Sequence, residues 1–372
     1  MATIPSILLF QLLIVLISLD LTDGGVGVCF GRLGNNLPSP ARTVALYKKH
    51  NIRRMRLYDP HPPTLRALAG TGIRLMLGVP NDNLPNLANC PDVATAWVRT
   101  NILTYPNVTF RYIAVGNEIE PESKLAPFVL PAMQNIYRAI RAARLGRQIR
   151  VSTSIRTDLL EKSFPPQDGV FKCSVNWYIR PIIEFLRDTR TPLLANIYPY
   201  FAYMEDRKNI NLSYALLQPN SGVMANGVYY DNLYYAILDA VDAAMEKILV
   251  SSPRLFSIFS EEKQTSGSGN PGGSGSETGW ASSGGGGVPP EAEVDYTAGL
   301  HDGPINTVEN ARIYNNNLMR IVKKGTPRRP NSRLETYIFA MYDENQKPGP
   351  EYERHFGIFL PNGRPKYPLR FH

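Results

Sequence analysis

Cysteine and histidine are both scarce in this sequence. Three cysteines stand among 372 residues, at Cys29, Cys90 and Cys173, and none belongs to a CxxC pair. A disulfide scaffold and a cysteine-rich zinc or iron–sulfur framework are therefore disfavoured, and at most one disulfide bond can form. The five histidines show neither HExxH nor HxH spacing, which disfavours a histidine metal site. We expect no metal and no cofactor.

Charged residues are also few, at 19%, whereas 43% of the residues are apolar and 10% are aromatic. This composition is that of a globular chain with a sizeable core, and a length of 372 residues fits one large α/β barrel more simply than several small domains. The net charge of +8 comes mostly from dispersed Lys and Arg without a nucleic-acid motif, so we expect no nucleic-acid partner. A soluble cationic surface is the simpler interpretation, and retention on an anionic extracellular matrix is the functional alternative.

The N-terminal residues predict a targeting signal. Ile7 to Leu19 are almost wholly apolar and are followed by Asp20, Asp23 and a Gly24-Gly25 pair, so residues 1–25 are expected to be a secretory signal peptide. Its removal would raise the net charge from +8 to +10, because it contains two acids and no base. The run is too short for stable membrane insertion. The C-terminus lacks an apolar tail, which argues against a lipid anchor.

Strand-like and helix-like segments alternate along the rest of the chain. Alternation of this kind predicts parallel strands, and its extent favours a single α/β domain, a (β/α)8 TIM barrel over residues 26–372. Gly25, Gly27 and Gly31 have the wrong spacing for a dinucleotide loop, which argues against a doubly wound sheet. The strand candidates are Val26–Phe30, Arg54–Tyr58, Ile73–Val79, Phe110–Val115, Ile149–Ser154, Leu193–Tyr198 and Thr336–Met341. The helix candidates are Pro40–Lys49, Pro63–Leu68, Pro91–Leu103, Ala126–Arg144, Pro181–Asp188, Tyr230–Lys247 and Thr307–Val322. One strand is missing between Lys247 and Thr336.

Polar and aromatic residues close several of these strands. In a barrel of this kind the carboxyl ends of the strands form one mouth, where the chemistry takes place. An acid, an amide and several aromatic rings would meet there, and this set suits a carbohydrate, whose apolar faces stack on rings while its hydroxyls bond polar groups. The residues are Tyr58, Asn117, Glu118, Tyr198, Phe201 and Glu344.

A second acid, Glu277, follows in the sequence Ser276-Glu277-Thr278-Gly279-Trp280. Glycoside hydrolysis needs one carboxylic acid to protonate the departing oxygen and one carboxylate to attack or stabilise the anomeric carbon. Two neighbouring carboxyls resist double ionisation, so the acid should have a raised pKa. We assign the acid role to Glu118 and the second role to Glu277.

Several ordered motifs spread over nearly the whole chain resemble the plant glucan endo-1,3-β-glucosidases, glycoside hydrolase family seventeen. These motifs begin at Gly27 (GVCFG), Met55 (MRLYDP), Ala114 (AVGNE), Asn196 (NIYPYF), Glu277 (ETGW) and Tyr337 (YIFAMYDENQK). The resemblance implies a (β/α)8 barrel that cuts β-1,3-glucans internally with retention of configuration.

The resemblance also implies residue roles. Glu118 matches the proton donor, Glu277 the nucleophile, and Asn117 the neighbour that bonds the sugar 2-hydroxyl. The matching groove aromatics are Tyr58, Tyr198 and Phe201, and Glu344 with Lys347 matches a supporting charged pair, although the two residues are equally well interpreted as a structural ion pair. Secretion to the cell wall or to the vacuole is implied as well, and we expect a monomer that binds a β-1,3-glucan polysaccharide or oligosaccharide.

The segment before Glu277 departs from that pattern. Residues 266–276 consist almost entirely of Gly and Ser and predict a flexible linker, part of an insertion around residues 263–290. Three arrangements follow. The linker loops out and a brief pairing by residues 276–278 closes the barrel, or residues 254–260 form the strand and Glu261 replaces Glu277, or neither acid reaches Glu118. The third arrangement would leave a catalytically impaired glucan-binding barrel, the alternative to a secreted retaining endo-β-1,3-glucanase.

Overall fold

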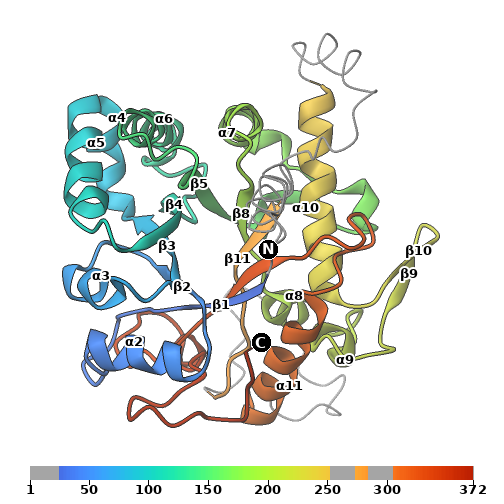
Figure 1. Cartoon of the computed structure of the whole chain (residues 1–372). Coiled ribbons are helices and arrows are strands. Elements are labelled where there is room, and N and C mark those ends of the chain that lie inside the picture. Colours follow the sequence, from blue (N-terminus) through green and yellow to red (C-terminus); the bar gives the residue numbers. More distant parts are fainter. Residues whose placement is uncertain (1–24, 252–272, 284–304, 372) are drawn as a thin grey trace, which may run out of the picture.

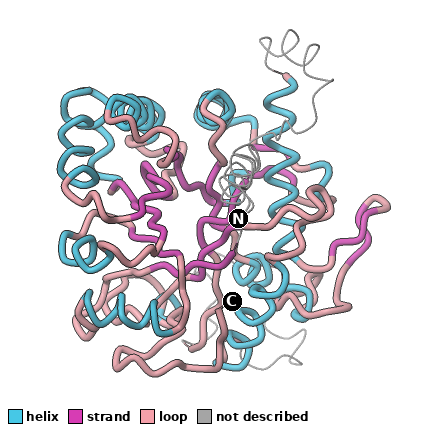
Figure 2. Tube along the Cα trace, viewed as in Figure 1, coloured by secondary structure: helices cyan, strands magenta, loops and turns pink. Residues whose placement is uncertain are grey.

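The computed structural model describes residues 25–251, 273–283 and 305–371. Eight parallel strands form one sheet in the order β11-β8-β5-β4-β3-β2-β1-β12, and a parallel bridge between Thr278 and Ile338 joins its two ends. The sheet is therefore a nearly closed barrel surrounded by helices (Figures 1 and 2). The strands are β1 (Gly25–Cys29), β2 (Arg54–Leu57), β3 (Arg74–Val79), β4 (Thr109–Asn117), β5 (Arg150–Arg156), β8 (Leu193–Asn196), β11 (Gly273–Glu277) and β12 (Glu335–Ile338).

The predicted barrel is confirmed, and the seven expected strands lie within three residues of their predicted ends. Their short apolar runs are buried on both faces, as in β2 and β3, because helices cover the outside while side chains fill the inside.

The expected signal peptide lies outside the described residues except for Gly25, which begins β1. Among the described residues no helix is both long and apolar enough to cross a membrane.

The helices of the outer layer begin largely where the sequence places caps or proline. The Ser39 hydroxyl accepts from the Arg42 amide at the start of α2, and Thr307 caps α11 in the same way. These helices are α2 (Pro40–Lys49), α3 (Pro62–Leu68), α4 (Leu84–Asn89), α5 (Pro91–Val98), α6 (Ala126–Ala142), α7 (Asn176–Asp188), α10 (Leu233–Val250) and α11 (Val308–Ile321). Helix α7 starts five residues before the predicted Pro181. Its apolar stripe, which includes Ile179, Ile182 and Ile183, is buried, and this packing outweighs the hydrogen bond that Pro181 cannot donate.

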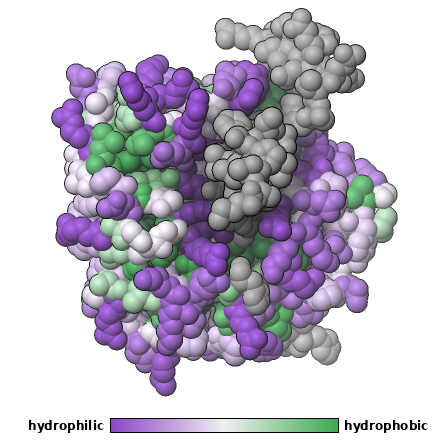
Figure 3. All heavy atoms as spheres, viewed as in Figure 1, coloured by the Kyte–Doolittle hydropathy of each residue, from purple (hydrophilic) through white to green (hydrophobic). Residues whose placement is uncertain are grey.

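Smaller elements build up the mouth of the barrel after β5 and β8. Two short strands, β6 (Leu160–Lys162) and β7 (Val170–Phe171), follow β5. The connection after β8 contains helices α8 (Pro199–Glu205) and α9 (Leu212–Ala215) and a hairpin of β9 (Val223–Ala225) and β10 (Val228–Tyr230). Hydrophilic residues cover most of the face seen in Figure 3, where apolar residues form small separate areas.

The eighth strand is β11, and it corrects the linker prediction. Gly273 to Gly275 pair in parallel with Leu193 to Ala195 of β8, and a bulge then brings Glu277 opposite Asn196. The expectation of a flexible linker is therefore wrong for residues 273–276, and the first of the three arrangements is the one observed at Glu277. The strand needs no large side chains of its own because Tyr234 of α10 fills the space beside Gly275, and the Ser276 hydroxyl bonds Asn196. Residues 254–261, with the alternative acid Glu261, lie outside the described residues.

Replacing Gly275 by alanine is expected to lower the free energy of unfolding by about 1–3 kcal/mol. A Cβ atom at this position would collide with the Tyr234 hydroxyl and would lie 2.7 Å from Oγ1 of Thr336. Urea unfolding measures the effect, with Gly146→Ala as the control, because Gly146 is exposed and a Cβ there meets the flexible end of Arg141. Adding Tyr234→Phe to Gly275→Ala should recover part of the loss. An unchanged unfolding midpoint in Gly275→Ala would contradict the packing described here.

Candidate active site

Strands β4 and β11 bring the two predicted acids to the mouth of the barrel. Glu118 directly follows β4, with a positive φ of 52°, and its amide donates to the Ser154 carbonyl on β5 at 2.9 Å. A non-glycine residue in the left-handed region costs conformational energy, and such residues concentrate at functional sites. Glu277 is the last residue of β11. Both carboxylates line one cavity of about 730 Å³.

The residues that line the cavity include an aromatic set and a polar set, which we call its aromatic side and its polar side. Its volume lies within the range of small-molecule and saccharide pockets. The aromatic residues are Tyr198, Phe201, Phe339, Tyr352 and Phe356, and several of their rings contact each other, with the Tyr198 and Phe201 centroids 5.2 Å apart. The polar side includes Arg156, Thr157, Asp158 and Ser163, which follow or end β5. Rings together with hydrogen-bonding groups suit a sugar.

A buried arginine, Arg56 of β2, lies at the centre of the site. Its Nη1 donates to Oε2 of Glu277 at 2.9 Å and to Oδ1 of Asn196 at 3.2 Å. Its Nη2 donates to Oδ1 of Asn117 at 2.6 Å and to the Ser154 hydroxyl at 3.3 Å. The nearby negative charges hold the pKa of Arg56 above its ordinary value despite burial. A permanent cation is therefore fixed beside one of the two acids.

Glu277 accepts hydrogen bonds from three side chains. Besides Arg56, the Tyr198 hydroxyl donates to Oε1 at 3.0 Å, and the Tyr58 hydroxyl donates to Oε2. All three are donors, and both oxygens of the Glu277 carboxylate act as acceptors. Tyr58 and Tyr198, expected as groove aromatics, thus contact the second acid through their hydroxyl groups, whereas Phe201 lines the cavity with its ring.

Glu118 has a different environment. Burial raises its pKa above the ordinary 4.5, and the negative charge of Glu277 raises it further. The Asn196 amide, which donates to Oε1 of Glu118 at 2.7 Å, and the charges of Arg56 and Arg156 act in the opposite direction. One carboxyl of the pair is therefore shifted towards its protonated form, as a general acid requires.

Three other predicted site residues have contacts that their motifs alone did not indicate. They are Asn117, Glu344 and Lys347. The Asn117 amide oxygen is already occupied by Arg56 and by Asn196 Nδ2 at 3.2 Å. Glu344 is buried and accepts from the Leu33 amide at 2.7 Å. No ion pair joins Glu344 to Lys347 in the described part of the chain, although the charge of Lys347 acts to lower the pKa of Glu344. Lys347 lines the cavity, and its ammonium pairs with Glu353 at 2.9 Å and lies 3.9 Å from the Phe339 ring centroid.

Sequence reasoning did not identify Arg56 or Asn196 as site residues. Asn196 connects the two acids, because its Nδ2 bonds Glu118 while its Oδ1 accepts from Arg56. A signal for Arg56 was present, since an arginine flanked by Met55 and Leu57 in a buried strand must have a buried partner. Asn196 ends its strand in the same way as Asn117.

Two other kinds of reactive group were possible at the site, a metal ion and a cysteine thiolate. No group of three or more His, Cys, Asp or Glu side chains within them is arranged to hold a metal ion. All three cysteines are free, and Cys29, buried beneath the site, has its pKa raised to about 12 by burial, so it is a thiol at neutral pH.

With paired carboxyls in one cavity at the mouth of a parallel barrel, the protein is a glycoside hydrolase. Comparison with known proteins narrows the class. The family model described as "Glycosyl hydrolases family 17" matches residues 26–371, and the chain belongs to this family.

Named relatives agree with this assignment. A probable glucan endo-1,3-beta-glucosidase of Arabidopsis thaliana is 44% identical over 98% of this chain and 96% of its own. The glucan endo-1,3-beta-glucosidase B of Solanum lycopersicum is 44% identical over 96% of this chain and 91% of its own. Among solved structures, CJP38, a beta-1,3-glucanase and allergen of Cryptomeria japonica pollen, superposes with a TM-score of 0.80 at 38% identity, over 93% of this chain and 99% of its own.

Proposed function

We propose that the protein is a secreted, retaining endo-β-1,3-glucanase in which Glu118 is the general acid and Glu277 the nucleophile. One observation carries the proposal: the two acids share a cavity but have unlike surroundings, since Glu118 is partly buried with a raised pKa and Glu277 accepts from a cation and two hydroxyls. The names of the relatives support the β-1,3-glucan substrate and cleavage within the chain.

The chemistry then proceeds in two steps. The protonated Glu118 gives its proton to the departing glycosidic oxygen while a Glu277 oxygen attacks the anomeric carbon and forms a glycosyl ester. Glu118, now ionised, takes a proton from water, and that water attacks the anomeric carbon and releases Glu277 with net retention. Arg56, Tyr58 and Tyr198 hold the Glu277 carboxylate in place during both steps. Asn117 is the proposed contact for the sugar 2-hydroxyl, and the aromatic side of the cavity stacks on sugar faces.

The proposed destination is the cell wall or the vacuole, and the proposed form is a monomer. The apolar stretch near the N-terminus supports export. A relative from Nicotiana plumbaginifolia, 43% identical over 98% of this chain, is named a basic vacuolar isoform, which supports the vacuole as an alternative.

Hydrolysis of a soluble β-1,3-glucan tests the function directly. Proton NMR of the first product should show the β-anomer before mutarotation, because two displacements at one carbon restore its configuration. An initial α-anomer would overturn the nucleophile role of Glu277. Binding of β-1,3-gluco-oligosaccharides without turnover would instead support the catalytically impaired barrel, and neither turnover nor saturable binding would indicate a structural wall protein.

The pH dependence of kcat/KM is expected to respond to Arg156. Activity requires protonated Glu118 and is lost as the pH rises through its pKa. Arg156 lowers that pKa from its place on the polar side of the cavity, so Arg156→Gln should move the alkaline limb of the profile to higher pH. The matched control is Lys162→Gln, which removes an exposed cation from the same connection, where Lys162 pairs with Asp168. Equal shifts in both variants would reflect net charge alone and would contradict a local effect on Glu118.

A further inference from the structure

Two of the basic segments of the chain contain no acidic residue. Residues 31–58 contain seven Lys and Arg and no Asp or Glu, and residues 354–372 contain four and none. The cationic excess of these two segments exceeds the +8 of the whole chain. Residues 123–157 and 310–334 likewise contain seven Lys and Arg each and no acid, so other parts of the chain are basic as well.

The two segments adjoin in the structure. The ring of His50, at the end of α2, lies 4.8 Å from the ring of Phe359, centroid to centroid, and Asn51 Nδ2 donates to the Phe371 carbonyl at 3.5 Å. They thus form one surface on the outside of the barrel, made of α2 and the C-terminal segment, which we call the α2 surface (Figure 1).

About half of the cations on these segments are neutralised by an acid. These five pairs are Arg32–Asp59, Arg54–Glu335, Arg56–Glu277, Arg354–Glu351 and Lys366–Asp343. Six cations are exposed and have no ion pair within the described residues: Arg42, Lys48, Lys49, Arg53, Arg364 and Arg370. The α2 surface therefore lacks its counter-charges, and an anionic partner would supply them.

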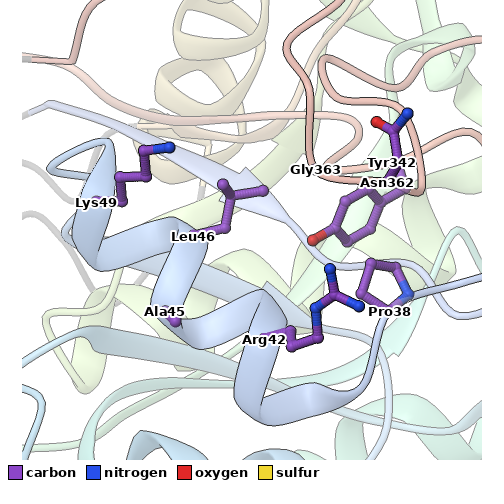
Figure 4. Close-up of a pocket in the computed structure, with 8 residues that line it drawn as sticks. All are labelled: Pro38, Arg42, Ala45, Leu46, Lys49, Tyr342, Asn362 and Gly363. Carbon is purple, nitrogen blue, oxygen red and sulfur yellow. The ribbon is translucent and has the colours of Figure 1, made fainter.

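A groove crosses this surface between α2 and the loop around Asn362 (Figure 4). It has a volume of about 280 Å³. Arg42 and Lys49 flank it seven residues apart on one helix, so their Cα atoms are separated by about 10.5 Å along the axis. Leu46 and Pro38 give it apolar contacts, and the side chains of Tyr342 and Asn362 add polar groups.

We propose that the α2 surface binds a linear polysaccharide of uronic acid residues. Carboxylates on the polymer would pair with Arg42 and Lys49, a sugar face would pack on Leu46 and Pro38, and hydroxyls would bond Asn362. The carboxylates of such a polymer recur at regular intervals, so two of them can pair with Arg42 and Lys49, which lie on the same side of α2. The groove between them has room for a sugar ring. A bilayer surface would need apolar side chains that project outward, whereas here they lie in the groove. Duplex DNA is a less suitable partner because no groove-reading motif accompanies the cations.

This binding site is separate from the catalytic cavity. None of the described residues that line the groove lines that cavity, yet the C-terminal loop contributes Phe356 to the cavity and Asn362 to the groove. Binding here would retain the protein on an acidic matrix and leave the cavity accessible. The inference does not depend on the glucanase proposal.

Co-sedimentation of the full chain with polygalacturonate coupled covalently to beads tests the proposal. The double variant Arg42→Gln, Lys49→Gln is expected to raise the apparent Kd about tenfold at physiological ionic strength and to make its salt dependence shallower, because fewer counterions are released. The matched control is Arg99→Gln, Arg147→Gln, which removes two exposed cations from another side of the barrel. Both variants should keep the wild-type unfolding midpoint and the wild-type rate on soluble β-1,3-glucan.

Binding measurements with other ligands identify the class of ligand. Fully methyl-esterified polygalacturonate, which lacks the charges, should not bind. Equal losses in the two double variants would show attraction by net charge alone and would overturn the proposal. So would a failure of wild-type protein to bind the acidic polymer, or binding of duplex DNA or of phosphatidylserine vesicles that is as tight and as dependent on Arg42 and Lys49.

Discussion

Replacing Glu277 by glutamine is expected to lower kcat on a soluble β-1,3-glucan by at least about 10⁴-fold. The amide cannot form the glycosyl ester, and it replaces a carboxylate held by Arg56, Tyr58 and Tyr198. KM should change far less, because Asn117, Phe201 and the aromatic side of the cavity remain. Initial rates of reducing-end release, with oligosaccharide binding measured by calorimetry, separate the two effects. Glu118→Gln should cause a loss of several orders of magnitude as well, since the departing sugar then leaves without a proton.

The matched control for this loss is Glu205→Gln. Glu205 ends α8 and lines the same cavity, but none of the groups around Glu118 and Glu277 bonds it in the described structure. Its variant should stay within a few-fold of the wild-type rate. Turnover that survives Glu277→Gln would refute Glu277 as the nucleophile and would direct attention to Glu261.

Replacing Arg56 by glutamine is expected to lower kcat by about 10²–10³-fold and to destabilise the fold by about 3–5 kcal/mol, because it leaves a buried carboxylate without its cation. Arg56 is only 1% exposed, and Glu277 is 6% exposed. The loss should fall on kcat far more than on KM, since Arg56 positions the Glu277 carboxylate and not the substrate. Arg56→Lys should restore part of kcat, although a lysine lacks the fork that reaches Glu277 and Asn117 together.

Arg54→Gln separates catalysis from stability in this experiment. Arg54 precedes Arg56 by two residues on β2 and is also buried, but it pairs with Glu335 at 3.7 Å. Its variant should lose stability and keep the wild-type kcat and KM. If Arg56→Gln behaves in the same way as Arg54→Gln, Arg56 has a structural role only.

The fold was largely predictable because its signals are local. Apolar runs such as Ile73–Val79 and a capped helix start such as Ser39-Pro40 are set by neighbouring residues, and the observed β3 and α2 agree with them. Strand β11 was not predictable, because Gly and Ser have no preference for a strand. Its conformation depends on pairing with β8, on the bridge to β12 and on the Tyr234 side chain, which come from distant parts of the sequence.

The site, like the fold, was predictable only where its signals are local. Residue type and position at a strand end sufficed to select Glu118 and the aromatic residues, because a parallel barrel brings all its strand ends to one mouth. Glu277 was selected as the second acid and by its family motif, without a predicted strand before it. The sequence by itself therefore determined the barrel and the two acids. Only the tertiary structure decided which partners each acid has: Arg56 and two tyrosine hydroxyls for Glu277, Asn196 for Glu118, and Glu353 in place of Glu344 for Lys347. Those contacts join residues that are far apart in the chain, and burial and charge at such short distances depend on packing, which no local pattern encodes.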